Sequence, residues 1–263
     1  MSAEAPDAIR VEGLAKSFGA VTALVDLSMH LREGECLGLL GDNGAGKSTL
    51  IKILSGFHRP DRGRILVDGE ERSIRSVDHA RSLGIDTVYQ DLALVPTLSV
   101  AHNMFLNREL TNGLGPFRWL SNGEMRRRAR SYIEDIGIRT LRSVQAEVAM
   151  LSGGQRQAIA IARSVHSGAR ILLLDEPLAA MGAKESEMIL DLIRDLKQQG
   201  HSMIVVAHNY VHVLEVCDRV NLIQHGRITL DRLSSETSAE ELTELVAREY
   251  RQAKRDASRS DPA

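Results

Sequence analysis

The sequence has little net charge, few aromatic residues, only two cysteines and no long apolar run. Its 33 Lys and Arg against 35 Asp and Glu argue against a dedicated nucleic-acid binder, because such proteins concentrate a basic excess on one face. No apolar run approaches the roughly 20 residues that cross a bilayer. The start, MSAEAPDAIR, has neither a basic nor an apolar signal region, so a soluble intracellular protein is expected.

The two cysteines, Cys36 and Cys217, lie in apolar stretches far apart in the sequence. We interpret them as buried free thiols rather than a disulfide, as is usual in a reducing cytosol. No segment of the chain repeats another, so the sequence holds one unit and not a tandem pair. At 263 residues that unit is long enough to bury a substantial core.

The hydrophobic pattern predicts an α/β fold. Residues Ala8 to Glu33 alternate apolar and polar positions around a glycine break, which indicates a β-hairpin. A short apolar run, Cys36 to Leu40, then leads through a glycine-rich turn into an amphipathic stretch, Lys47 to Ser55. Strand, glycine loop and helix in this order are typical of a nucleotide-binding unit. A second β segment is expected at Arg64 to Glu70, with Asp68-Gly69 as its turn.

Between about Asp91 and Met150 helix-period stretches appear and strand-like runs are absent, which predicts a helical insertion. The α/β rhythm then returns with helices expected at 152–165 and 184–199, strands at 171–174 and 203–207, and a closing hairpin at 220–230. We therefore expect an α/β domain over residues 8–235 with a helical subdomain at about 91–150. Residues 236–263 should form a short helix, begun by a Ser238–Glu241 capping box, and a disordered tail after Tyr250.

The run GDNGAGKS, residues 41–48, matches the G-x-x-x-x-G-K-[ST] phosphate-binding loop and lies between a predicted strand and a predicted helix. Glycines allow consecutive backbone N–H groups to point at phosphate oxygens. Lys47 is placed to neutralise β- and γ-phosphate charge, and the Ser48 hydroxyl can bind Mg²⁺. The predicted nucleotide-binding residues of this loop are Gly41, Asp42, Asn43, Gly44, Ala45, Gly46, Lys47, Ser48 and Thr49.

The run ILLLDEP, residues 171–177, places two carboxylates at the end of a buried strand. Strands often end in acidic turns, so the run alone is weak support, but beside a phosphate-binding loop it has a specific meaning. Asp175 would hold Mg²⁺ or its bound water, as a Walker-B aspartate does. Glu176 would then accept a hydrogen bond from the attacking water and act as general base.

The run LSGGQ, residues 151–155, comes directly before a predicted helix. Ser152 is expected to cap that helix, while Gly153 and Gly154 expose its N-terminal amides and so create an anion site without a lysine. A second phosphate-binding helix end in one chain suggests that Ser152 to Gln155 act on the nucleotide of another molecule. The alternative interpretation is a glycine-rich loop with an ordinary N-cap.

Together these motifs resemble the ATP-binding subunits of ABC transporters over roughly Ala8 to Asp231. Gln90, in TVYQD, matches the glutamine that contacts Mg²⁺ and water and faces the membrane subunit. His208, at the end of MIVVAH, matches the histidine that bonds the γ-phosphate. Phe18, in KSFGAVTAL, matches the aromatic residue that stacks on adenine. Without the resemblance, His208 would be read as a strand-end residue with a local partner and Phe18 as core.

Two positions depart from the usual pattern of that family. Gly182 stands near the place of an aspartate that couples the two ATP sites, and Leu178 replaces a usual threonine. Carbohydrate importers resembling ribose and fructose systems often have glycine there. The stretches YQDLALVPTLSVAHNMFLNRE and AHNYVHVLEVCDRVNLIQHGRI also closely resemble those importers, many of which are tandem proteins of twice this length.

The resemblance implies a P-loop NTPase core of the RecA-like type with an antiparallel β flank and a helical insertion. Two copies, expected as a homodimer, would enclose two MgATP, with Glu176, His208, Lys47 and Gln90 in catalytic roles. The expected partners are integral-membrane permease subunits and, indirectly, a solute-binding protein, with no nucleic acid. The chain would then lie at the cytoplasmic face of a bacterial membrane and power sugar uptake.

Other functions remain open on the sequence alone. A soluble ABC ATPase, such as an assembly factor for iron–sulfur clusters, would need no membrane partner. DNA-repair and translation ATPases usually carry long coiled coils or basic linkers, which this sequence lacks; the basic cluster at Arg126 to Arg130 is interpreted as a solvated helix face. Export, or import of a solute other than a sugar, is a further alternative.

Overall fold

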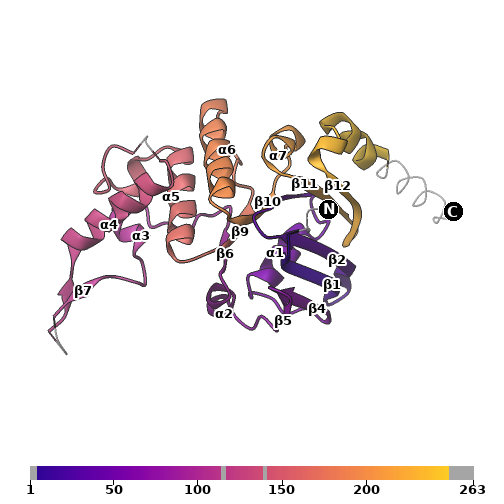
Figure 1. Cartoon of the computed structure of the whole chain (residues 1–263), viewed down its shortest axis with the longest axis horizontal. Coiled ribbons are helices and arrows are strands. Elements are labelled where there is room, and N and C mark those ends of the chain that lie inside the picture. The colour runs from indigo at the N-terminus through magenta and orange to yellow at the C-terminus, as the bar shows by residue number, and fades with distance from the viewer. Residues whose placement is uncertain (1–4, 114–116, 139–140, 249–263) are drawn as a thin grey trace.

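The computed structural model describes residues 5–113, 117–138 and 141–248. Its N-terminal part is an antiparallel sheet in the order β2-β1-β4-β5 (Figure 1). The strands are β1 (Asp7–Phe18), β2 (Val21–Arg32), β4 (Arg62–Val67) and β5 (Glu70–Glu71). β1 and β2 pair antiparallel, which confirms the predicted hairpin. Every second residue is buried over Leu27, Met29 and Leu31, while register shifts interrupt the alternation in β1.

A second sheet forms the centre of the molecule, in the order β12-β11-β3-β10-β9-β6. All of its neighbouring strands are parallel except β12, which returns antiparallel to β11. The strands are β3 (Cys36–Leu40), β6 (Ile85–Val88), β9 (Ile171–Asp175), β10 (Ser202–Val206), β11 (Arg219–Gln224) and β12 (Arg227–Leu233). The carboxyl ends of β3, β9 and β10 therefore meet at one edge of this sheet.

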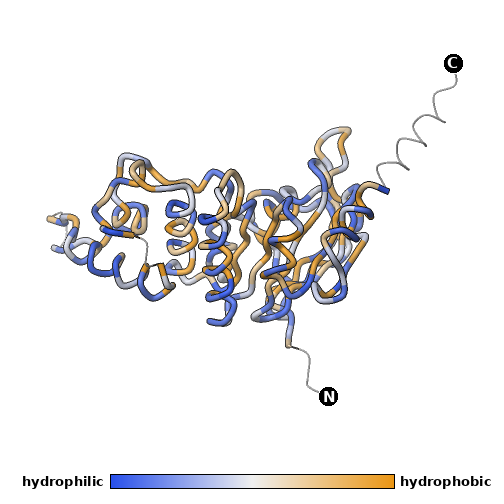
Figure 2. The backbone as a smooth tube through the Cα atoms, turned by 90° about the horizontal axis from the view of Figure 1, so that it is seen from above, coloured by the Kyte–Doolittle hydropathy of each residue, from blue (hydrophilic) through white to orange (hydrophobic). Residues whose placement is uncertain are grey.

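Both faces of the central sheet are covered, which is why its strands are almost wholly apolar. Successive residues of β9 pack into opposite cores: Leu172 and Leu174 face the helices α5, α6 and α7, whereas Ile171 and Leu173 face α1 and the antiparallel sheet. The helices are α1 (Lys47–Leu54), α5 (Gly153–His166), α6 (Ala183–Gln198) and α7 (Tyr210–Val216). Seen from above, blue and orange alternate along the tube of these helices, as expected for amphipathic elements with one buried face (Figure 2).

The segment between β6 and α5 projects to one side of the sheet (Figure 1). Its elements are α3 (Val100–Met104), α4 (Asn122–Asp135) and the 3₁₀ turn Val148–Met150. The expectation that it lacks strands is wrong in one detail, because β7 (Thr111–Asn112) and β8 (Trp119–Leu120) form a small antiparallel pair. Two residues a side are too few to leave a readable alternation in a sequence.

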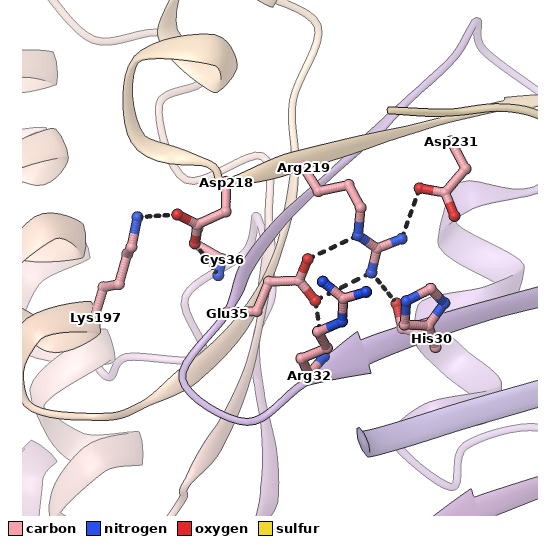
Figure 3. Close-up of polar contacts among 8 residues, drawn as sticks. All are labelled: His30, Arg32, Glu35, Cys36, Lys197, Asp218, Arg219 and Asp231. Carbon is pink, nitrogen blue, oxygen red and sulfur yellow. Dashed lines mark hydrogen bonds and ion pairs between the residues drawn. The ribbon is translucent and has the colours of Figure 1, made fainter. Parts of the chain in front are cut away.

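A buried ion-pair network ties the central sheet to the antiparallel flank (Figure 3). The Arg219 guanidinium on β11 contacts both carboxylate oxygens of Glu35, at 2.7 and 3.0 Å, and Asp231 Oδ1 on β12 at 2.7 Å. It also donates to the carbonyl of His30 on β2, at 2.6 Å. Glu35 and Arg219 are only 8% and 5% exposed, so neither charge could be left unpaired without a large cost.

Cys36 and Cys217 are buried free thiols, as predicted, and their sulfur atoms lie 3.5 Å apart. Residues 239–248 are helical, and the Ser238 hydroxyl accepts from the backbone of Glu241 as a capping residue should. The expected disordered tail falls outside the described residues. Besides β7 and β8, the sequence did not predict β6, α7 or the short helix α2 (Val77–Ser82). Among the described helices, none is both long and apolar enough to cross a membrane.

Candidate functional site

A cavity of about 340 Å³ lies at the carboxyl edge of the central sheet, where β3, β9 and β10 end. Most of the residues predicted to bind nucleotide or metal line it, together with Ala23 and Ala179. The predicted residues in its wall are Asp42, Asn43, Gly44, Gly46, Lys47, Ser48, Thr49, Gln90, Asp175, Glu176 and His208. The fold thus brings together four segments that are separated by up to 166 positions in the sequence (208 − 42).

The loop from Gly41 to Gly46 can be built only with glycine at two of its positions. Gly46 has φ 116°, and a Cβ there would lie 2.7 Å from the Ala23 carbonyl oxygen. Gly41 has φ 144°, and a Cβ there would lie 2.2 Å from the Ile223 carbonyl oxygen. Because both backbones approach so closely, any larger residue would displace the start of α1. Ala45 is buried behind the loop, where its carbonyl accepts from Gly226.

The Lys47 ammonium lies inside the curve of this loop. Its Nζ donates to the carbonyl of Gly41 at 2.5 Å and to the carbonyl of Asp42 at 2.9 Å. Burial lowers the pKa of Lys47, although Glu176, Asp42 and Asp175 oppose that shift by Coulomb attraction. A cation held in this way favours the approach of an anion such as a triphosphate.

The two carboxylates at the end of β9 differ in backbone geometry. Asp175 is the last residue of the strand, whereas Glu176 has φ 54°, in the left-handed region that non-glycine residues seldom adopt. The N–H of Glu176 donates to the Val206 carbonyl at 2.9 Å, which fixes this conformation. A strained conformation held by the surrounding fold is a feature of functional sites.

Burial raises the pKa of both Asp175 and Glu176. His208 and Lys47 oppose the shift of Glu176, and His208 Nε2 lies 2.7 Å from Glu176 Oε1. The Glu176 side chain is 15% exposed and that of His208 is 52% exposed. The carboxylate is therefore mostly buried, and its histidine partner is open to solvent. A carboxylate whose pKa is raised is a better acceptor of a proton from water than an ordinary one.

The donor set of the cavity fits Mg²⁺. Ser48, Gln90 and Asp175 line the same cavity and offer it a hydroxyl, an amide and a carboxylate oxygen. Among the described residues no group of three His, Cys, Asp or Glu could hold a metal alone. Mg²⁺ in nucleotide sites takes one or two protein oxygens and completes its shell with phosphate and water, so this sparse set suits it.

Two predicted parts of the site lie elsewhere. Ser152 caps α5, its hydroxyl accepting from Gln155 N at 3.3 Å while Gln155 Oε1 accepts from Ser152 N at 3.1 Å, and no residue of 152–155 lines the cavity. Phe18 also lies outside the lining, at the end of β1, with its ring against His58 at 5.1 Å between centroids. Phe18 is 43% exposed, so the alternative of Phe18 as a core residue is wrong.

Comparison with known proteins agrees with this geometry. The family described as "ABC transporter" matches residues 24–179. The chain belongs to this family. The xylose/arabinose import ATP-binding protein of Sulfolobus acidocaldarius is 43% identical to it over 91% of the chain and 94% of that protein. The fructose import ATP-binding protein of Rhizobium meliloti is 44% identical over 83% of the chain and 85% of that protein.

Longer relatives and solved structures complete the comparison. The ribose import ATP-binding protein of Chromobacterium violaceum is 38% identical over 90% of this ABC chain but only 46% of its own length. A nucleotide-free ATP-binding cassette of an ABC transporter superposes with a TM-score of 0.76 at 24% identity, covering 92% of the chain and 95% of that cassette. A cassette of the cbiONQ complex from Clostridium perfringens gives 0.75 at 27% identity, covering 92% and 94%. The ABC-type P-loop fold is therefore established.

Sequence reasoning about this ABC chain missed three residues near the site. Ala23 and Ala179 line the cavity but carry no chemical group that a motif search would notice. Glu185 lies beside the LSGGQ segment, where a Cβ on Gly154 would lie 3.0 Å from the Glu185 Cβ. The spacing Gly182 to Glu185 could have indicated it, since an acidic residue three positions after a helix N-cap reaches back to the cap.

Proposed function

We propose that the chain binds and hydrolyses MgATP as the motor subunit of a sugar importer, with the cavity of 340 Å³ as its phosphate site. The proposal depends on one observation: Lys47, Asp175, Glu176 and His208 all line the same cavity. Loss of the ammonium in Lys47→Ala should weaken ATP affinity and abolish turnover. Normal affinity and activity in that variant would place the nucleotide elsewhere.

In this proposal the loop amides and Lys47 bind the β- and γ-phosphates, assisted by the positive end of α1. Ser48, Gln90 and Asp175 would hold Mg²⁺, which supplies charge neutralisation of the phosphates when bound. Glu176 orients the attacking water and takes its proton. His208, 2.7 Å from Glu176 Oε1, orients that carboxylate and is exposed enough to reach the γ-phosphate.

We further propose that residues Ser152 to Gln155 bind the nucleotide of a second copy. Their absence from the lining of the chain's own cavity supports an arrangement in which each ATP is enclosed by the loop of one copy and the LSGGQ segment of the other. Mixing Lys47→Ala chains with Ser152→Arg chains should then restore some activity, because both defects fall on one of the two sites. No recovery in proven heterodimers would contradict the arrangement.

The transported solute is proposed from the relatives. Those that cover most of this chain carry names that specify import of xylose and arabinose, fructose or ribose. Such a role places the chain on the cytoplasmic face of the membrane with a permease partner and, indirectly, a solute-binding protein. Co-purification of the tagged chain with an integral-membrane partner, and stimulation of its ATPase by that partner in liposomes, would support this role over a soluble ABC ATPase.

A further inference from the structure

The loop that carries Gln90 has an unusual backbone conformation. The N–H of Leu92 donates to the Tyr89 carbonyl at 3.0 Å and so closes a turn around Gln90. Leu92 and Ala93, at the end of that turn, have φ 20° and φ 45°. Two successive residues with positive φ are strained when neither is glycine, and such strain persists only where the surrounding structure imposes it.

Arg163 holds these two residues from a neighbouring helix. It lies on α5, and its Nη1 and Nη2 atoms donate to the carbonyls of Ala93 and Leu92 at 2.8 and 2.9 Å. The planar guanidinium can serve two neighbouring acceptors at once, which an ammonium does less well. One side chain, 70 positions away from Ala93 in the sequence, therefore fixes the backbone directly after Gln90 and Asp91.

The position of this cation is costly unless the carbonyls compensate for it. Arg163 is half-buried, and burial lowers its pKa against the attraction of Asp86. The Asp86 carboxylate is itself bonded to Arg81 Nε at 3.1 Å. The hydrogen bonds to Leu92 and Ala93 are therefore the contacts that offset the desolvation of the Arg163 guanidinium.

We propose that Arg163 is a positioning residue for Gln90. It holds the turn in the conformation that places Gln90 in the wall of the cavity, together with Ser48 and Asp175. This inference rests on the proposed function, in which those three residues would hold Mg²⁺. Without the guanidinium, Leu92 would relax toward an ordinary φ and Gln90 would leave the metal site. Arg163 does not line the cavity, so it acts on the metal only through Gln90.

The test separates binding of the metal from binding of the nucleotide. In a Glu176→Gln background, which should block turnover, the affinity for fluorescent methylanthraniloyl-ATP is measured with saturating Mg²⁺ and again in EDTA. The ratio of the two affinities is the contribution of the metal. Arg163→Met should lower this ratio about tenfold and leave the affinity in EDTA unchanged. Loss of a group behind a metal ligand typically costs about 10- to 100-fold, and the low end applies because phosphate and water complete the Mg²⁺ shell.

Two further variants connect the effect to Gln90. Arg163→Lys keeps the charge and can serve one of the two carbonyls, so it should lower the affinity ratio by a smaller factor than Arg163→Met. It also decides the question if Arg163→Met does not fold. Gln90→Ala should lower the ratio as well, and the double variant with Arg163→Met should be no worse than Gln90→Ala alone, because both changes remove the same contact.

Arg108→Met is the matched control. Arg108 Nη1 also donates to a backbone carbonyl, that of Ser167 at the C-terminal end of α5, at 3.3 Å. Its loss should leave the affinity ratio unchanged. Hydrogen–deuterium exchange of the amides of residues 91–94 gives a second readout that needs no ligand. Arg163→Met should speed this exchange about tenfold or more, as expected for lost hydrogen bonds to a charged group, and Arg108→Met should not.

The inference is overturned if Arg163→Met lowers the melting temperature but keeps the parent affinity ratio, since Arg163 would then be a structural residue only. A parent ratio in Gln90→Ala would also overturn it, because no metal contact would remain to be positioned. The proposed function is judged by Lys47→Ala, which should weaken binding in Mg²⁺ and in EDTA alike. If Lys47→Ala binds the analogue normally, or the parent chain does not bind it, the proposed function fails and the inference fails with it.

Discussion

Replacement of Glu176 by glutamine tests whether the Glu176 carboxylate takes a proton from the attacking water. In the parent chain His208 Nε2 lies 2.7 Å from Glu176 Oε1. Glutamine keeps the size of the side chain and an oxygen within reach of His208, but it cannot accept a proton from water. Its backbone can keep the left-handed conformation at φ 54° about as well as glutamate can. The variant should therefore fold normally and differ only in charge and basicity.

The expected loss follows from the role of the group. Removal of a general base typically slows a reaction about 10²- to 10⁴-fold, which corresponds to roughly 3–5 kcal/mol in the barrier. ATP binding should hold or tighten, because one of the two carboxylates beside the phosphates loses its charge. Burial raises the pKa of Glu176, so the ionised carboxylate is already disfavoured in the chain alone, and its neutral replacement relieves that cost.

The assay combines two readouts. Single-turnover phosphate release gives the chemical rate, and size-exclusion chromatography with ATP or ADP reports closure. Glu176→Gln should bind MgATP, release phosphate at least about 100-fold more slowly than the parent and accumulate as a dimer with ATP only. Asp175→Asn should instead lose the metal and fail to close. Hydrolysis by Glu176→Gln near the parent rate would show that Glu176 is not the base.

Three further substitutions test other parts of the structure. Phe18→Ala should raise the KM for ATP several-fold with little change in kcat, because stacking is made in ground and transition states alike; an unchanged KM would refute the adenine contact. Asp175→Asn should raise the melting temperature of the nucleotide-free protein at pH 8, since burial raises the folded-state pKa of Asp175. That gain should vanish as the pH falls through this pKa toward the unfolded value, and a gain that grows in acid would contradict it. Arg219→Met should lower the free energy of unfolding by about 3–5 kcal/mol in urea titrations, and adding Glu35→Gln should recover part of the loss; a small effect of the single change would mean that water reaches Glu35.

The sequence was sufficient for the fold class because the motifs coincide with element boundaries. The strand before Gly41 is apolar throughout since both faces of β3 are buried, and the glycines are enforced by contacts that the structure makes visible. The same logic located Asp175 at the end of β9. Amphipathic helices such as α6 were predicted to within one residue at each end, because one of their faces packs on the sheet.

Elements with little pattern could not be predicted. The strand Ile85–Val88 contains Asp86 and Thr87, which interrupt its apolar run, and it is stabilised by pairing with β9 from 86 residues away (171 − 85). Helix α7 has only seven residues and begins with an Asn209 cap, whose side chain accepts from Val211 and His212. Neither signal is distinctive at that length.

Contacts between remote side chains also escape a reading of the sequence. Nothing in the spacing of Cys36 and Cys217 indicates that their sulfur atoms lie 3.5 Å apart. The pairing of His208 with Glu176 depends on the parallel arrangement of β9 and β10, which places the two strand ends side by side. The motif reading supplied the residues, and the sheet order supplied their geometry.

The two halves of the proposed composite site differ in their electrostatics, and this difference implies an order of events. Around the phosphate loop, burial shifts the pKa of Lys47, Asp175 and Glu176 against the charged form of each. The bound phosphates would stabilise the charged form of Lys47, and a bound cation would stabilise the charged forms of the two carboxylates. This half of the site therefore favours ligand binding before the two copies meet. The LSGGQ half is the capped start of α5, where Ser152 and Gln155 already hydrogen-bond to each other. ATP should therefore bind first to the phosphate loop of one copy, and the LSGGQ segment of the other copy should then close on the loaded loop.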